Sequence, residues 1–230
     1  METYTRLIPE HPGAGRLGRH VEHDPRSRDF PALVDSAAPL QTVHHRTGGL
    51  PLDQGNVGSC TGNACAGALN TQPLHVARGR YLTEVDALAL YESATLLDTQ
   101  PGSYPPTDTG SSGLAVAKAA KAKGLISAYR HAFGIEGALG ALQQGPVITG
   151  VHWYESFDQP DSAGMVWIGG QVRGGHEFVV VGYVAQKVDP YVVAMNSWGK
   201  TYGLSGRYKF TVDTWTRLLA EDGDVTILVR

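Results

Sequence analysis

The chain has 230 residues, 42% of them hydrophobic and 18% charged, so it can bury a core in one large domain or in two halves sharing a cleft. Its formal net charge of −3 provides no basic surface for nucleic acid or an anionic membrane. No apolar run is long enough to span a membrane. We therefore expect neither nucleic-acid nor membrane partners, and the composition is compatible with any oligomeric state.

The N-terminal twenty residues lack the apolar middle of a signal peptide. The two cysteines, Cys60 and Cys65, lie five positions apart and make no disulfide framework. Together these features predict a cytoplasmic protein, or one released without the ordinary secretory route. The cysteines form no C-x₂-C pair and no histidine pair has supportive ligand spacing, so we expect no metal and no cofactor.

Residues 1–50 are broken by prolines and carry dense charge, which predicts an extended arm. We expect this arm to lie along the outside of the C-terminal half of the molecule. The alternative is a pro-segment that passes through a cleft and is later removed. Residues 40–52 are predicted to be a strand or an extended lead-in to the next motif.

Residues 53–69, DQGNVGSCTGNACAGAL, change from turn residues to small helix-compatible residues at Cys60. A helix N-terminus favours thiol ionisation, so Cys60 is a candidate nucleophile. Gln54 can offer an amide donor beside the sulfur. A buried structural cysteine is an equally good interpretation of Cys60 alone, and it is the better interpretation of Cys65, inside the helix.

Residues 51–130 are predicted to form a helical half. After the Cys60 helix, Thr83 is placed to cap a second helix, with Asp86 three positions later. A loop rich in glycine, proline and serine spans 99–113. A third helix follows at about 111–123 and ends before Gly124.

Residues 131–230 are predicted to form a β-rich half. Apolar and β-branched runs predict strands at 147–154, 165–168, 178–184, 191–195, 206–212 and 225–229, and helices at 135–144 and 214–221. The order predicts an α+β fold with two lobes. The helical half comes first and the β-rich half second, with a cleft expected between them.

Two further polar groups can reach that cleft. His176 follows Gly174 and Gly175 at the expected start of a strand, and Asn196 ends another strand. An asparagine there can fix the tautomer of the imidazole while Trp198 shields the bond from water. A simple turn explains the sequence NSWG equally well on these grounds.

The motifs Q-G-x-x-G-S-C, then G-H-x-x-x-x-V-G-Y, then N-S-W-G-x-x-x-G occur in this order over about residues 50–210. In this combination the chain resembles the papain-like cysteine peptidases. The sequence DQGxxGSCT and the absence of disulfide-forming cysteines make it most similar to the bacterial and bacteriophage branch.

The resemblance implies a two-lobed α+β fold in which a β-barrel-like half follows the helical half and the active site lies in the cleft between them. It also implies a peptidase acting on peptide or protein substrates through an acyl-enzyme. It implies a thiolate–imidazolium pair between Cys60 and His176, with Asn196 orienting the imidazole. Gln54 and the backbone N–H of Cys60 would form the oxyanion hole, and Trp198 would cover the bond between histidine and asparagine.

The resemblance also places substrate-binding backbone at Gly110 and Ser111, and Gly175 beside the histidine. There are departures from the family pattern. Thr61 replaces the aromatic residue that usually follows the nucleophile, Tyr202 replaces a second tryptophan, and Gly175 stands where peptidases often have Asp or Asn. These changes leave the catalytic groups in place and alter the expected substrate preference.

Two competing hypotheses come from other classes. One is a catalytically weak or inactive papain-fold protein with a peptide-binding or structural role, for instance in a phage particle. The other is a different Cys–His enzyme such as a transglutaminase or a cell-wall amidase. The second is disfavoured because those enzymes lack a glutamine six residues before the cysteine.

Overall fold

A computed structural model describes residues 4–35, 38–76 and 79–230. The helices are α1 (Cys60–Leu69), α2 (Glu84–Thr95), α3 (Gly113–Ala122), α4 (Gly134–Leu142) and α5 (Val212–Ala220), with 3₁₀ turns η1 (Pro25–Asp29) and η2 (Glu155–Asp158). The strands are β1 (Tyr4–Arg6), β2 (Val21–His23), β3 (Val43–His44), β4 (Ala128–Ala132), β5 (Val147–Tyr154), β6 (Val172–Val184), β7 (Tyr191–Met195), β8 (Arg207–Thr211) and β9 (Asp224–Val229).

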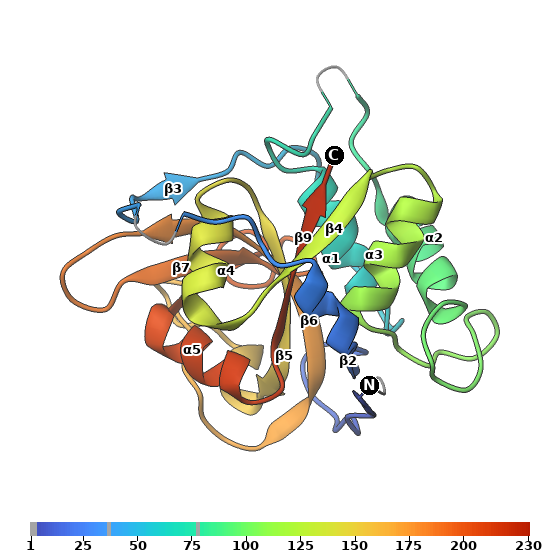
Figure 1. Cartoon of the computed structure of the whole chain (residues 1–230). Helices are drawn as coiled ribbons and strands as arrows, with labels where there is room; N and C mark the ends of the chain where they lie inside the picture. Colours follow the sequence, from blue (N-terminus) through green and yellow to red (C-terminus); the bar gives the residue numbers. More distant parts are fainter. Residues whose placement is uncertain (1–3, 36–37, 77–78) are drawn as a thin grey trace.

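An antiparallel sheet in the order β4-β9-β5-β6-β7-β8 forms the centre of the molecule, and β3 pairs with β6 outside this path. β1 and β2 form a separate two-stranded ribbon. In Figure 1, α2 and α3 lie on one side of the sheet and α4 and α5 on the other. The predicted α+β class is therefore confirmed.

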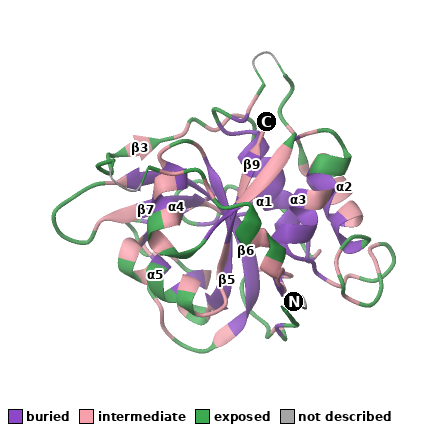
Figure 2. Ribbon diagram, viewed as in Figure 1, coloured by how far each residue is buried: buried purple, intermediate pink, exposed green. Residues whose placement is uncertain are grey.

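Side-chain alternation along β6 explains this arrangement, because successive residues of a strand point to opposite faces. Phe178 and Val180 belong to the core that includes α4 and α5. Val179 and Val181 belong to the core that includes α1, α2 and α3. Every residue of α1 is buried, as Figure 2 shows, so this helix lies between the sheet and the other two helices.

The helix boundaries follow the capping signals in the sequence. The N–H of Thr83 donates to the Asp86 carboxylate over 2.8 Å at the start of α2. Ser112 caps α3 by accepting from the N–H of Ala115 over 3.1 Å. Gly124, just beyond α3, has φ +69°. The predicted helices are confirmed to within a few residues at each end.

The strands differ from prediction in three places. β6 begins at Val172, so His176 lies inside a strand instead of at its start. The predicted strand at 165–168 is reduced to a single bridge between Met165 and Lys209. Residues 128–132 form β4, which was not predicted. Gly174 extends β6 because its backbone pairs with Trp153, a long-range contact that local residue preference does not encode.

Candidate functional site

Cys60 is the first residue of α1, and its neighbour Ser59 occupies the cap position. The side chain is completely buried. Backbone N–H groups of Glu177 and Thr61 face the sulfur and favour a negative charge on it. Because Glu177 directly follows His176, this contact brings the start of α1 against the histidine-bearing part of β6.

His176 has a defined tautomer. Its Nε2 lies 2.7 Å from Asn196 Oδ1, and the N–H of Ser197 donates to the same oxygen over 2.8 Å. An oxygen that accepts from Ser197 also accepts from the imidazole, so His176 Nε2 carries the hydrogen. His176 Nδ1 is then a lone-pair acceptor, buried and without a hydrogen-bond partner in the part of the chain that the structure describes.

Two tryptophans enclose the imidazole of His176. The Trp198 ring lies 5.2 Å from it, tilted by 40°, and the Trp153 ring lies 4.6 Å from it, edge to face at 73°. Sequence reasoning found Trp198 and missed Trp153. The signal was available, because Trp153 lies in β5 with Val151, which pairs directly with His176, and alternation puts both side chains on one face.

Gln54 connects the loop before Cys60 with the end of β7. Its backbone N–H donates to Ser197 O over 2.8 Å, and its Oε1 accepts from Ser197 Oγ over 2.5 Å. Its Nε2 donates to Val57 O over 2.8 Å. One of the two Nε2 hydrogens is used in that bond, which leaves the second free for a ligand.

The candidate substrate-binding backbone is occupied by the N-terminal arm. Ser111 N donates to Gly18 O over 2.9 Å, and Ser111 O accepts from His20 N over 2.8 Å. On the opposite wall, Gly175 O accepts from Arg19 N over 2.9 Å. Arm residues 18–20 therefore bridge the two walls on which an extended peptide was expected to lie.

The neighbouring part of the arm continues across the site. Trp198 Nε1 donates to Arg16 O over 3.1 Å. Leu17 is fully buried in the core that contains Trp153. Gly18 lies so close to Gly58, in the loop before Cys60, that a methyl group on it would overlap the Gly58 carbonyl oxygen. The segment 15–20 thus covers the buried cysteine and histidine.

This position corrects the expectation that the whole arm lies outside the β-rich half. Only the later part does so. Ala32 N donates to His131 O over 2.8 Å, and Val43 pairs with Tyr183 in the sheet. The early part enters the cleft because the unpaired backbone groups of Ser111 and Gly175 offer hydrogen bonds to an extended chain.

Burial sets the protonation of the covered pair. It raises the pKa of the Cys60 thiol to about 12, against the opposing effect of the facing N–H groups. Burial also lowers the pKa of His176 to about 4, and the bond to Asn196 only partly offsets this. In this conformation burial therefore opposes the ionisation of Cys60 that its place at the helix start led us to expect, and it also opposes protonation of His176.

Other predicted features fall outside the site. Cys65 is buried inside α1, and burial raises its pKa to about 12. Over residues 4–35, 38–76 and 79–230, no group of three His, Cys, Asp or Glu side chains is arranged to hold a metal ion. No helix within these ranges is long and apolar enough to cross a membrane.

Comparison with models of known protein families gives no match. Among curated proteins, the cathepsin B-like cysteine proteinase 3 of Ostertagia ostertagi is 32% identical over 68 residues, which cover 30% of this chain and 39% of that protein. A gut-specific cysteine proteinase of Caenorhabditis elegans is 32% identical over 87 residues, which cover 36% of this chain and 26% of that protein. The chain thus matches less than half the length of either relative.

Solved structures match almost the whole chain. Xylellain, a cysteine protease from Xylella fastidiosa, has a TM-score of 0.75 and 17% identity over 96% of this chain and 98% of its own. Procathepsin L 3 of the Tenebrio molitor larval midgut has a TM-score of 0.69 and 16% identity over 98% of this chain and 84% of its own. The expected papain-like fold is confirmed.

Proposed function

We propose that this chain, with its papain-like fold, is a cysteine peptidase whose site is held in a latent conformation by arm residues 15–20. The observation that carries the proposal is the ring geometry of His176. Its Nε2–H is fixed on Asn196, and the unpartnered Nδ1 lone pair is buried with the start of α1 nearby. A base held in one tautomer and a thiol at the start of a helix are the two groups that nucleophilic catalysis requires.

The reaction begins when the arm leaves and solvent reaches the pair. His176 Nδ1 takes the thiol proton of Cys60, which gives a thiolate and an imidazolium. The thiolate attacks the scissile carbonyl carbon and forms a tetrahedral oxyanion. The imidazolium then donates its proton to the amide nitrogen, the C–N bond breaks, and an amine leaves a thioester behind. Water, deprotonated by His176, hydrolyses the thioester and restores the thiol.

Supporting groups act on the two charges that develop. The backbone N–H of Cys60 and the remaining Nε2 hydrogen of Gln54 are the proposed donors to the oxyanion. Asn196 and the two enclosing tryptophans stabilise the ring orientation of the imidazole. Gly110, Ser111 and Gly175 are proposed to bind substrate backbone through the groups that now bind the arm.

The proposal is tested by labelling the full-length chain with an epoxide reagent for cysteine peptidases, followed by mass mapping of the modified residue. The reagent should label Cys60 slowly in the native chain and rapidly in Gly18→Ala, whose added methyl group would overlap Gly58 and dislodge the arm. Hydrolysis of a mixed peptide library should rise in parallel.

Cys65→Ala in the Gly18→Ala background is the control, and it should leave labelling and hydrolysis intact. Rapid labelling of Cys60 with no hydrolysis of any peptide would contradict the peptidase and support the competing peptide-binding role. Absence of labelling in a folded Gly18→Ala protein would show that Cys60 is not the nucleophile.

A further inference from the structure

Arg19 is the arm residue at the centre of the covered site, and its side chain is completely buried. Buried guanidinium groups are rare unless they are paired. Here the pairing carboxylates come from β6 and from the start of β9. Arg19 Nη2 donates to the Asp224 carboxylate and to the backbone oxygen of Asp222, the latter over 2.7 Å. Arg19 Nε lies 4.0 Å from Glu177 Oε2.

Two glycines provide the space for these groups. A Cβ on Gly113 would lie 2.5 Å from Glu177 Oε1 and 3.0 Å from Asp224 Oδ1. A Cβ on Gly150 would lie 2.5 Å from Glu177 Oε2 and 2.6 Å from Arg19 Nε. Any larger residue at either position would close the space, so α3 and β5 both leave room for the guanidinium. We call this space, formed by Gly113, Gly150, Glu177 and Asp224, the acidic pocket.

The carboxylates of the acidic pocket are in excess over the group that fills it. Glu177 is fully buried, and neither of its carboxylate oxygens has a hydrogen-bond partner within the described residues. Asp224 Oδ1 also has none there. Burial, and the charge of Asp224, raise the pKa of Glu177 well above its usual value, while Arg19 opposes this shift. The fully buried Glu177 and the partly buried Asp224 therefore lie close enough to repel each other when ionised, and the Arg19 guanidinium is the cation that offsets this repulsion.

The pocket lies directly beside the proposed catalytic groups. Glu177 follows His176 in β6, and its N–H faces the Cys60 sulfur. The backbone of Arg19 is bonded to Gly175, and its neighbours Gly18 and His20 are bonded to Ser111. A side chain entering the acidic pocket thus belongs to a chain that lies along the substrate-binding backbone.

We propose that the acidic pocket is a specificity pocket for an arginine side chain of the substrate, and that Arg19 of the arm occupies it in the latent state. This inference rests on the proposed peptidase function. A planar guanidinium suits the pocket better than an ammonium, because its Nη2 binds Asp222 O and Asp224 while its Nε lies 4.0 Å from Glu177. Nε and Nη1 of Arg19 have no hydrogen-bond partner within the described residues, so Glu177 is paired with the guanidinium by charge and not by a hydrogen bond. An apolar side chain would leave the buried Glu177 without a neighbouring cation, which disfavours it.

Binding is measured first, because it does not depend on peptidase activity. Full-length Arg19→Ala leaves the pocket without its guanidinium, and ethylguanidinium at millimolar concentration should raise its melting temperature more than ethylammonium does. The native chain, with the pocket filled, should show no such difference. Asp224→Asn combined with Arg19→Ala should remove the guanidinium effect.

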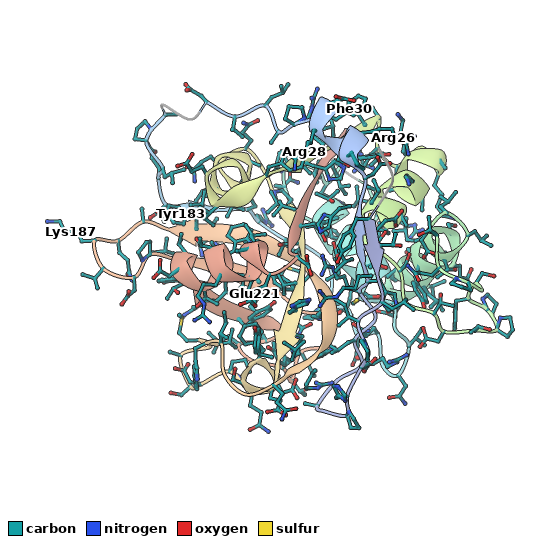
Figure 3. All side chains as sticks on the ribbon, turned by 60° about the horizontal axis from the view of Figure 1, so that its bottom comes forward. Arg26, Arg28, Phe30, Tyr183, Lys187 and Glu221 are labelled. Atoms are coloured by element: carbon teal, nitrogen blue, oxygen red, sulfur yellow. The ribbon has the colours of Figure 1, made fainter. Side chains whose placement is uncertain are left out.

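Arg26→Ala is the matched control for loss of an arginine. Arg26 lies on η1 at the outer surface (Figure 3), with its side chain 78% exposed and paired with Asp24. This variant should behave as the native chain does with both ions. An equal response of Arg19→Ala to ethylguanidinium and ethylammonium would overturn the preference for guanidinium, and no response to either would overturn the pocket.

Specificity is measured next in the Gly18→Ala/Arg19→Ala background, in which the arm is released, with peptides that differ only at one position, Arg against Leu. At the substrate position that enters the acidic pocket, we expect kcat/KM to be at least tenfold higher for the arginine peptide than for the leucine peptide. Adding Asp224→Asn should bring the ratio of these two kcat/KM values close to one. Asp222→Asn is the control, since the Asp222 side chain pairs with Arg6 outside the pocket, over 2.7 Å, and only its backbone oxygen contacts Arg19.

The two proposals fail differently. If no peptide is hydrolysed but ethylguanidinium binds as expected, the peptidase function is wrong and the acidic pocket stands as a binding site for guanidinium groups. If peptides are hydrolysed with a preference for leucine over arginine, the peptidase function stands and the specificity inference is wrong.

Discussion

The two parts of the N-terminal arm are both extended and proline-containing, yet they are bound very differently. In the first part Leu17 and Arg19 are completely buried between the walls of the site. In the second part Leu33 is 67% exposed although its neighbours bond to the sheet side of the molecule. The two parts differ because they contact different surfaces. The first part contacts otherwise unpaired backbone groups and the acidic pocket, whereas the second part contacts a solvated edge of the sheet.

If the chain is the proposed peptidase, this difference means that one part of the arm controls the site and the other does not. Residues 15–20 take the hydrogen bonds of Ser111 and Gly175 that we propose for a substrate, and they cover the buried Cys60 and His176. Residues 30–35 and 38–45 contact the outside of the β-rich half, for example through the pairing of Val43 with Tyr183 and the bond from Gln144 Nε2 to Leu33 O. The following predictions alter the two parts, or the groups beneath the first part, in order of decreasing effect.

The largest effect is expected at the nucleophile. In the arm-released Gly18→Ala background, Cys60→Ala should lower kcat/KM for peptide hydrolysis by at least about 10³-fold, because the group that forms the acyl-enzyme is lost. Cys65→Ala, five positions further along the same helix, should change it less than about twofold, as expected of a residue remote from the reacting atoms. Similar losses in both variants would indicate that the helix, and not the thiol, is responsible.

Gln54→Ala should separate two reactions of the same thiol. Loss of one oxyanion donor costs on the order of 3 kcal/mol in amide hydrolysis, or about 10²-fold. Alkylation of Cys60 forms no oxyanion and should change little. The ratio of the two rates in the Gly18→Ala background is the measurement. A parallel fall in both would instead mean that Gln54 supports the loop through its bonds to Ser197 and Val57.

The buried imidazole predicts a pH dependence of stability in the latent chain. The folded pKa of His176, about 4, lies below the ordinary value of 6.5, so the unfolded chain binds more protons between these values. Stability from this group is complete above pH 6.5 and is lost as the pH falls through 4, with a total of about 3 kcal/mol.

Urea unfolding of the native chain and of His176→Gln at pH 7.5 and pH 5 measures this dependence. The native chain should lose more stability on acidification than the variant does. The variant serves as the control for every other group, including Glu177, whose raised pKa acts in the opposite direction. Identical losses in the two proteins would show that His176 is already exposed to solvent.

The smallest effects are expected from single substitutions that compare the two parts of the arm directly. Leu17→Ala removes a fully buried side chain and should speed Cys60 alkylation about tenfold, because core truncations of this type cost about 2–5 kcal/mol and weaken the docked segment. Leu33→Ala removes a mostly exposed one and should leave the rate unchanged. Equal acceleration by both would mean that the arm is released as one unit.

Much of this arrangement could be predicted from the sequence. Turn and cap residues indicated the positions of α1 and α2, and apolar, β-branched runs indicated β5 and β7. Cys60 and Asn196 were singled out because each stands at the end of a regular element, and His176 was singled out because it was expected, wrongly, at the start of a strand. Gln54 was added by its spacing to Cys60.

The rest depends on contacts between distant parts of the chain. β4 was missed because Ala128–Ala132 is a strand only through pairing with β9. Trp153 was missed because its role depends on the register of β5 against β6. The position of residues 15–20 was mispredicted because an extended segment has no hydrophobic periodicity from which the surface that it contacts could be predicted. The ion pair between Arg19 and Asp224 joins residues far apart in sequence, and the number of charged residues in the chain does not show which of them pair.

The central claim is that residues 15–20 hold a competent site closed. The most direct measurement is the alkylation rate of Cys60 at neutral pH in the full-length chain and in Gly18→Ala, both checked for an intact fold by circular dichroism. We expect the rate to be at least about tenfold higher in the variant, because the pKa of Cys60 falls once burial is relieved. Equal rates in two folded proteins, with the arm shown to be displaced, would contradict it.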